Sequence, residues 1–199
     1  MSKIPEEVNL LSEPELYKYF DMSIKIALLE LIKKGRIDIA IARLLFGYVF
    51  KTEKSKVIGE QKVWKYLSAV FSRLDTEYDV AIGYLEKNPI YFCVDKVKAK
   101  KKIGWIHNDY EKLGMDKNID NKYFNNLDYI FTVSEECLNI LKNIFPQHND
   151  KFKLMHNIVS AKTIRKLSLE EISDVKFSGE NINIVSVGRL NYQKGFEMA

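Results

Sequence analysis

Four short apolar runs, separated by segments long enough for helices, constrain the fold of this chain more than any other feature. They cover residues 79–85, 102–107, 128–133 and 152–156, and polar residues bound each of them. Short apolar runs are typical of strands buried in a parallel sheet, and their alternation with helices favours a doubly wound arrangement. We therefore predict an α/β fold with a Rossmann-like parallel sheet flanked by helices. Ligands of such sheets bind outside the carboxyl ends of the strands.

Helical spacing of apolar residues marks the segments around these strands. In residues 13–35 the apolar side chains recur at three- and four-residue steps. Further helices are predicted over residues 37–51, 59–74 and 135–145. In 37–51 apolar residues occupy nearly the whole circumference, which favours burial on more than one side over contact with a partner or a membrane. Ser134 is expected to cap the helix over 135–145.

The composition is that of an ordinary globular protein, with 46% hydrophobic and 29% charged residues among 199. A net charge of +4 is too small to indicate nucleic-acid binding. Cys93 and Cys137 lack the spacing of a disulfide framework or a zinc site, so we expect two free thiols. The N-terminus does not resemble a secretory signal, and the most apolar stretch, 37–50, is too short and too charged to span a bilayer. We expect a cytoplasmic protein.

Five lysines are concentrated in residues 96–102, just before a predicted strand. Such a run can attract acidic lipid headgroups, which would place the protein at the periphery of a membrane. A solvated, charged loop that leads into the strand is the simpler interpretation.

A second group of candidate residues follows the apolar run 182–187, which we predict to be a strand. Gly188 permits a sharp turn, and Arg189 and Lys194 would place two cations near the start of a helix. That arrangement suits a diphosphate. Exposed Arg and Lys residues at this spacing are also common as solvated charges, and the residues alone leave both interpretations open.

Another candidate residue is His107, which ends the predicted strand 102–107. It lies in the segment Lys-Ile-Gly-Trp-Ile-His-Asn-Asp, residues 102–109. A single histidine at a strand end is more often structural than functional. Its position is nevertheless the one at which α/β folds place their sites, and imidazole can donate a hydrogen bond near neutral pH.

Together these segments resemble the retaining, sugar-nucleotide-dependent glycosyltransferases of the two-domain GT-B type, family 4 (glycosyl transferases group 1). Residues 186–197, Ser-Val-Gly-Arg-Leu-Asn-Tyr-Gln-Lys-Gly-Phe-Glu, are similar to the opening of that family's donor-binding domain. The WIHND segment at 105–109 is similar to the family segment whose histidine lies by the donor sugar. Residues 78–86 and 127–136 resemble the family's core strands, and residues 155–159 resemble its exit toward the hinge.

The resemblance implies a function. The protein would transfer a sugar from a UDP- or GDP-sugar to a hydroxyl of a glycan or lipid-linked acceptor, with retention, as in polysaccharide or glycolipid synthesis. It would need neither a metal nor a further cofactor. Gly188, Arg189 and Lys194 would bind the donor diphosphate, and the catalytic residue His107 would lie beside the donor sugar.

The resemblance also implies a domain organisation. Residues 1–157 would form an acceptor-side Rossmann-like domain, 158–180 a connector, and 181–199 the start of the nucleotide-sugar-binding domain. The family's first strand unit and its distal E-x7-E region have no counterpart here, so both domains are expected to be truncated and the chain alone to be inactive. The alternatives are a domain that only binds an acceptor or partner, and another GT-B enzyme such as a sugar-nucleotide epimerase.

Overall fold

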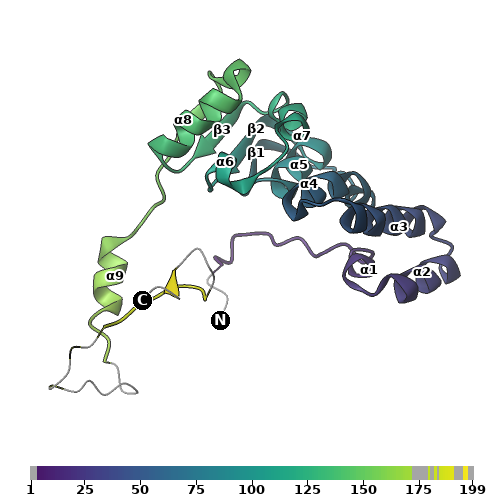
Figure 1. The fold of residues 1–199 in the computed structure, drawn as a ribbon, viewed down its shortest axis with the longest axis horizontal. Coiled ribbons are helices and arrows are strands. Elements are labelled where there is room, and N and C mark those ends of the chain that lie inside the picture. The colour runs from purple at the N-terminus through teal and green to yellow at the C-terminus, as the bar shows by residue number, and fades with distance from the viewer. Residues whose placement is uncertain (1–3, 172–178, 180–181, 183, 191–194, 197–199) are drawn as a thin grey trace. The chain divides into compact units, whose positions relative to one another are not determined.

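The computed structural model describes residues 4–171, 179, 182, 184–190, 195 and 196. The chain divides into two compact units, residues 1–157 and 158–199 (Figure 1). The first unit holds a parallel sheet and the helices that pack on it, and the second has one short helix among its described residues. Within the described residues, no helix is long and apolar enough to cross a membrane.

The sheet confirms the predicted α/β class. Its four strands are β1 (Glu77–Gly83), β2 (Lys98–Ile106), β3 (Tyr129–Thr132) and β4 (Phe152–Leu154). They lie in the order β1-β2-β3-β4, and every neighbouring pair is parallel. The register places Ile103 beside Ile82 on one side and Tyr129 on the other. The apolar runs therefore become strands that all end at the same edge.

Helical connections join the strands. They contain α5 (Asn88–Lys96), α6 (Tyr110–Leu113), α7 (Lys117–Phe124) and α8 (Glu135–Ile144). Parallel crossovers are right-handed, so connections that step across a sheet in one direction lie on one face. The strand residues that are buried belong to that face: Ala81, Gly83, Gly104, Ile106, Ile130, Thr132 and Phe152. The opposite face carries exposed or half-buried apolar residues: Val80, Ile82, Ile103, Trp105, Tyr129 and Phe131.

Two glycines allow the chain to pack tightly on the covered face. A Cβ at Gly83 would lie 2.6 Å from the Cα of Ile90 and 2.8 Å from the carbonyl oxygen of Pro89. A Cβ at Gly104 would lie 2.7 Å from a methyl group of Leu127. The first turn of α5 therefore lies directly against the end of β1, which also determines where the β1–α5 loop leaves the sheet.

The first predicted helix differs from the structure. The expected single helix over 13–35 is wrong, because the chain forms α1 (Lys18–Asp21) and α2 (Ile24–Lys33) with a break between them. The side chain of Arg43 reaches this break from α3 (Ile37–Thr52) and donates to the carbonyl oxygens of Tyr19 and Met22 at 2.9 Å each. These bonds satisfy carbonyl groups that a helix end leaves free.

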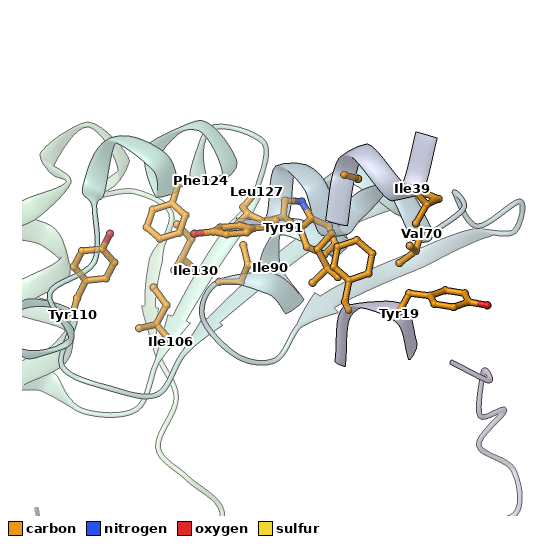
Figure 2. Close-up of a cluster of buried hydrophobic side chains, with 14 of the residues drawn as sticks. Tyr19, Ile39, Val70, Ile90, Tyr91, Ile106, Tyr110, Phe124, Leu127 and Ile130 are labelled. Atoms are coloured by element: carbon orange, nitrogen blue, oxygen red, sulfur yellow. The ribbon is translucent and has the colours of Figure 1, made fainter. Parts of the chain in front are cut away.

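The next helical segment is α4 (Lys56–Leu67) followed by a 3₁₀ turn, η1 (Ser68–Val70), close to the predicted 59–74. Ser55 caps α4, accepting from the backbone N–H of Ile58 at 3.3 Å. Trp64 of α4 packs against Tyr91 and Phe92 of α5. One core cluster thereby extends from the sheet through these aromatic side chains to α1–α3 (Figure 2).

The prediction that residues 37–51 are buried on more than one side is wrong. In α3 the buried side chains Ile39, Ala40, Ala42 and Arg43 form a single face. The apolar residues on the other side of this helix are exposed, because α2 and α4 pack on the first face alone.

A buried carboxylate connects four helices. Asp120 of α7 accepts hydrogen bonds from the hydroxyls of Tyr91 and Tyr110 at 2.5 Å each, and from Gln61 Nε2 of α4 at 2.9 Å. Gln61 Oε1 in turn accepts from the backbone N–H of Asp116 at 2.7 Å. Burial raises the pKa of the Asp120 carboxyl, and it also raises the pKa of both tyrosine hydroxyls.

The lysine run and the segments after α8 contain the remaining elements. Lys96–Lys102 is not a loop before the strand, because β2 begins at Lys98 and pairs with β1 from its first residue. The 3₁₀ turn η2 (Pro146–His148) follows α8. The expected connector, residues 158–180, contains α9 (Ala161–Leu167), capped by Ser160. Ile182 and residues 184–187 show no strand, since no described strand lies beside them to supply the hydrogen bonds.

We predict that Gly83→Ala lowers the free energy of unfolding by about 1–3 kcal/mol, because a methyl group there overlaps the backbone of α5. The matched control is Gly59→Ala in α4, where the added Cβ meets Phe50 at an ordinary 3.5 Å and helix propensity favours alanine. Urea unfolding followed by circular dichroism measures both variants. Equal stability of the two would contradict the close approach at Gly83.

Tyr91→Phe should cost about 1–3 kcal/mol, since Asp120 loses one of three donors in a buried site. Tyr123→Phe is its control, because Tyr123 stacks on Tyr91 at 3.9 Å between ring centroids without a hydrogen bond to Asp120. The same urea experiment applies. A loss as large for Tyr123→Phe would mean that ring packing, and not the hydrogen bond, explains the effect.

Candidate functional site

The candidate site lies at the carboxyl edge of the sheet, where two neighbouring strands end. Residues 84–87 follow β1, and residues 107–109 follow β2. Because β1 and β2 are parallel and paired, these two loops leave the sheet side by side. The prediction that His107 lies directly beyond the end of a parallel strand is confirmed.

His107 is half-buried and held by the neighbouring loop. Its Nε2 lies 2.9 Å from the carbonyl oxygen of Tyr84, and its backbone N–H points at Glu86 Oε2 at 3.4 Å. The imidazole also packs edge-on against the Tyr84 ring at 4.8 Å and parallel to the Trp105 ring at 5.9 Å. The contacts with Tyr84 and Trp105 thus restrict the orientation of the ring.

These contacts determine which nitrogen of His107 is available to a ligand. A carbonyl oxygen can only accept, so Nε2 must carry the hydrogen that it shares with Tyr84. In the neutral ring Nδ1 is then an acceptor, and no described residue hydrogen-bonds to it. In the neutral ring Nδ1 can therefore only accept a hydrogen bond, and donating one from Nδ1 would require the protonated ring.

Glu86 is a site residue to which the sequence reasoning gave no role. Its carboxylate accepts from the backbone N–H of His107 and from the side-chain amide of Asn108. The half-buried carboxylate thereby connects the loop after β1 to the loop after β2. The sequence contained a signal for this role. Glu86 follows one predicted strand and His107 ends the next, and neighbouring parallel strands end at the same edge of a sheet.

Lys87 shows backbone strain beside this carboxylate. Its φ is +67°, a value that residues with a side chain rarely adopt. Its ammonium group forms an ion pair with Glu60 of α4 at 2.5 Å, which holds the residue in place. Strained positions of this kind cluster near functional sites, where the surrounding structure compensates for their cost.

Asp109, which had no predicted role, caps α6. One carboxylate oxygen accepts from the backbone N–H groups of Glu111 and Lys112 at 3.0 and 3.2 Å, and the other pairs with Lys112 Nζ at 2.8 Å. The Lys112 side chain, aided by these backbone bonds, lowers the pKa of the Asp109 carboxyl. Asp109 therefore stabilises the loop after His107 and is already occupied by protein groups.

Several other polar and thiol side chains of the first unit have structural surroundings. Ser134 caps α8, as expected, accepting from the Cys137 backbone N–H at 3.2 Å. His148 is buried, and burial lowers the pKa of its imidazole. His156 is exposed, with Nδ1 at 3.2 Å from the carbonyl oxygen of Val133. Cys93 and Cys137 are both free thiols.

The diphosphate residues belong to the second unit. Gly188 and Arg189 are exposed and lie outside regular secondary structure. Lys194 lies outside the described residues. His107 belongs to the first unit. Among the described residues, no group of three or more histidine, cysteine or acidic side chains is placed to hold a metal ion.

Comparison with known proteins does not identify a family, since no protein-family model, curated protein or solved structure matches the chain. The fold and the site place the protein in the class of α/β proteins with a Rossmann-like parallel sheet.

We predict opposite tautomers for two histidines in one spectrum. At a pH where the rings are neutral, His107 should carry its proton on Nε2, whereas His156, whose Nδ1 faces the Val133 carbonyl, should carry it on Nδ1. Long-range ¹⁵N–¹H correlation on histidine-labelled protein separates these forms, and His107→Gln and His156→Gln assign the signals. A proton on Nδ1 of His107 would contradict the site geometry.

Proposed function

We propose that this protein acts in retaining glycosyl transfer, as a glycosyltransferase of the GT-B type similar to family 4. It would bind a UDP- or GDP-sugar and pass the sugar to a hydroxyl of a glycan or lipid-linked acceptor. The observation that carries this proposal is His107, a half-buried imidazole at the carboxyl edge of a parallel sheet with Nδ1 left for a ligand. That edge is where open α/β sheets bind their ligands.

In this proposal His107 orients the donor sugar by accepting a hydrogen bond from one of its hydroxyls at Nδ1. Glu86 is a positioning residue, because it contacts the His107 backbone and Asn108 rather than a ligand. Restricting the ring before the ligand arrives reduces the entropy lost on binding.

The sequence motif at 188–194 supplies the second part of the proposal. Arg189 and Lys194 would offset the charge that builds up on the diphosphate as the glycosidic bond breaks, and Gly188 would let the backbone turn towards it. Arg189 is exposed and therefore accessible to such a ligand. The proposed reaction uses no metal ion, so these cations would carry the whole electrostatic role.

Donor binding tests the proposal directly. We expect calorimetric titration with UDP-glucose or GDP-mannose to show binding, and Arg189→Ala to weaken it about ten-fold or more, because a hydrogen bond to a charged group is lost. The matched control is Arg165→Ala in α9, an exposed arginine of the same unit. His107→Gln should change donor affinity by less than about three-fold, since it contributes orientation more than attraction.

Two results would reject the proposal. One is the absence of binding to every nucleotide sugar tried, and the other is equal weakening by Arg189→Ala and Arg165→Ala. Because the chain alone is expected to be inactive, incubation with radiolabelled donors and lipid acceptors uses a protein joined to the family's first strand unit and E-x7-E region, and it then separates the alternatives. Donor binding with interconversion of the sugar but no transfer would favour an epimerase, and acceptor binding without donor binding would favour a binding domain.

A further inference from the structure

Helix α3 exposes a continuous apolar stripe. Its residues recur at the spacing of one helical face, from i to i+4, i+7, i+8 and i+11. They are Ile37, Ile41, Leu44, Leu45 and Tyr48, each between 39% and 65% exposed. The stripe lies opposite the buried face of the helix, so packing against α2 and α4 leaves it in solvent.

Helix α2 repeats this arrangement. Ile26, Leu29 and Ile32 follow each other at three-residue steps and are between 51% and 62% exposed, while Ala27 and Leu31 are buried. The two helices form a hairpin, joined by a short link in which Gly35 adopts a φ of +69°, and they pack against each other (Figure 1). We call these eight exposed apolar residues of α2 and α3 the hairpin surface.

The hairpin also carries an excess of positive charge. Residues 24–52 contain six lysines and arginines against two acids, a net charge of +4 that equals the charge of the whole chain. One of the two acids, Asp38, is already paired with Arg36 through two bonds of 2.8 and 3.0 Å. This pair is neutral, so the net charge of +4 comes from the other residues of the hairpin.

Exposed lysines lie within the stripes themselves. Lys25 and Lys33 are four residues before and after Leu29, which places all three on one face of α2. Lys51 follows Tyr48 by three residues on α3. None of these three lysines forms an ion pair with another described residue.

We propose that the hairpin surface binds an anionic lipid bilayer, with its isoleucine and leucine side chains at the level of the headgroups. Apolar stripes flanked by lysines are attracted both by acyl chains and by negative surface charge. A second copy of this chain fits less well, because two hairpins of +4 would repel each other. The inference goes beyond the proposed function, since it depends only on the exposed residues of α2 and α3.

The lysine run at 96–102 is less suited than the hairpin surface to bind an anionic bilayer. Lys100 and Lys101 pair with Asp79 and Asp128 at 2.7 Å, and Lys102 donates to the Val94 carbonyl oxygen at the same distance. Three of its five ammonium groups are thus already engaged. The hairpin surface combines apolar area with free cations, which the lysine run does not.

Vesicle sedimentation tests the proposal on the full chain. We expect the protein to sediment with vesicles of equimolar phosphatidylcholine and phosphatidylglycerol, and to remain in the supernatant with phosphatidylcholine alone. Leu44→Asp should reduce the partition coefficient about ten-fold or more, and Lys51→Glu about five-fold or more. High salt should weaken the binding of the parent protein.

Each variant has a matched control. Val80→Asp places the same change at a residue of the uncovered sheet face with the same exposed fraction as Leu44, 47%. Lys162→Glu makes the same charge change on α9. Circular dichroism verifies that all four variants fold, and both controls should bind vesicles like the parent.

Three outcomes would overturn the proposal. The first is no sedimentation with anionic vesicles, and the second is an equal loss for the controls and the hairpin variants. The third is a concentration-dependent dimer, measured by sedimentation velocity, that Leu44→Asp abolishes. That result would assign the hairpin surface to a second copy of the chain.

Discussion

At Gly83 the backbone of α5 lies against the end of β1, closer than any side chain would permit. The chain leaves β1 and enters α5 within residues 84–87, where the backbone of Lys87 has a φ of +67°. Glu86 is thereby carried over the end of β2, where its carboxylate meets the backbone N–H of His107. The geometry of the candidate site thus depends on the close approach at Gly83 as well as on the contacts among the site residues.

The direction of the crossovers determines where the core can extend. Because every helical connection lies on one face of the sheet, the core cannot grow on the other, and it extends sideways through Trp64 and Tyr91 to the N-terminal helices. Parallel sheets ordinarily bury both faces. Here, within the described residues, one sheet face and the hairpin surface both keep apolar side chains in solvent, and only the hairpin surface combines them with a strong positive charge.

The four strands and α8 could be predicted because their signals lie in short stretches of sequence. Apolar runs of strand length and the Ser134 cap predicted the four strands and α8, and strand direction placed His107 at the carboxyl edge. What escaped prediction depends on distant partners. The break after α1 needs Arg43 from a later helix, and the start of β2 at Lys98 needs the edge of β1. The role of Glu86 likewise appears only once two loops are adjacent.

The central claim is that a nucleotide-sugar ligand binds at the carboxyl edge of this sheet, beside His107. Titration of ¹⁵N-labelled protein with a UDP-sugar and a GDP-sugar, followed by backbone amide chemical shifts, measures this most directly. The account predicts that one of the two shifts the amides of residues 84–88 and 107–109 in a saturable manner, while those of the hairpin at 24–52 stay unchanged. Saturable shifts confined to other residues, or none with either ligand, would contradict it.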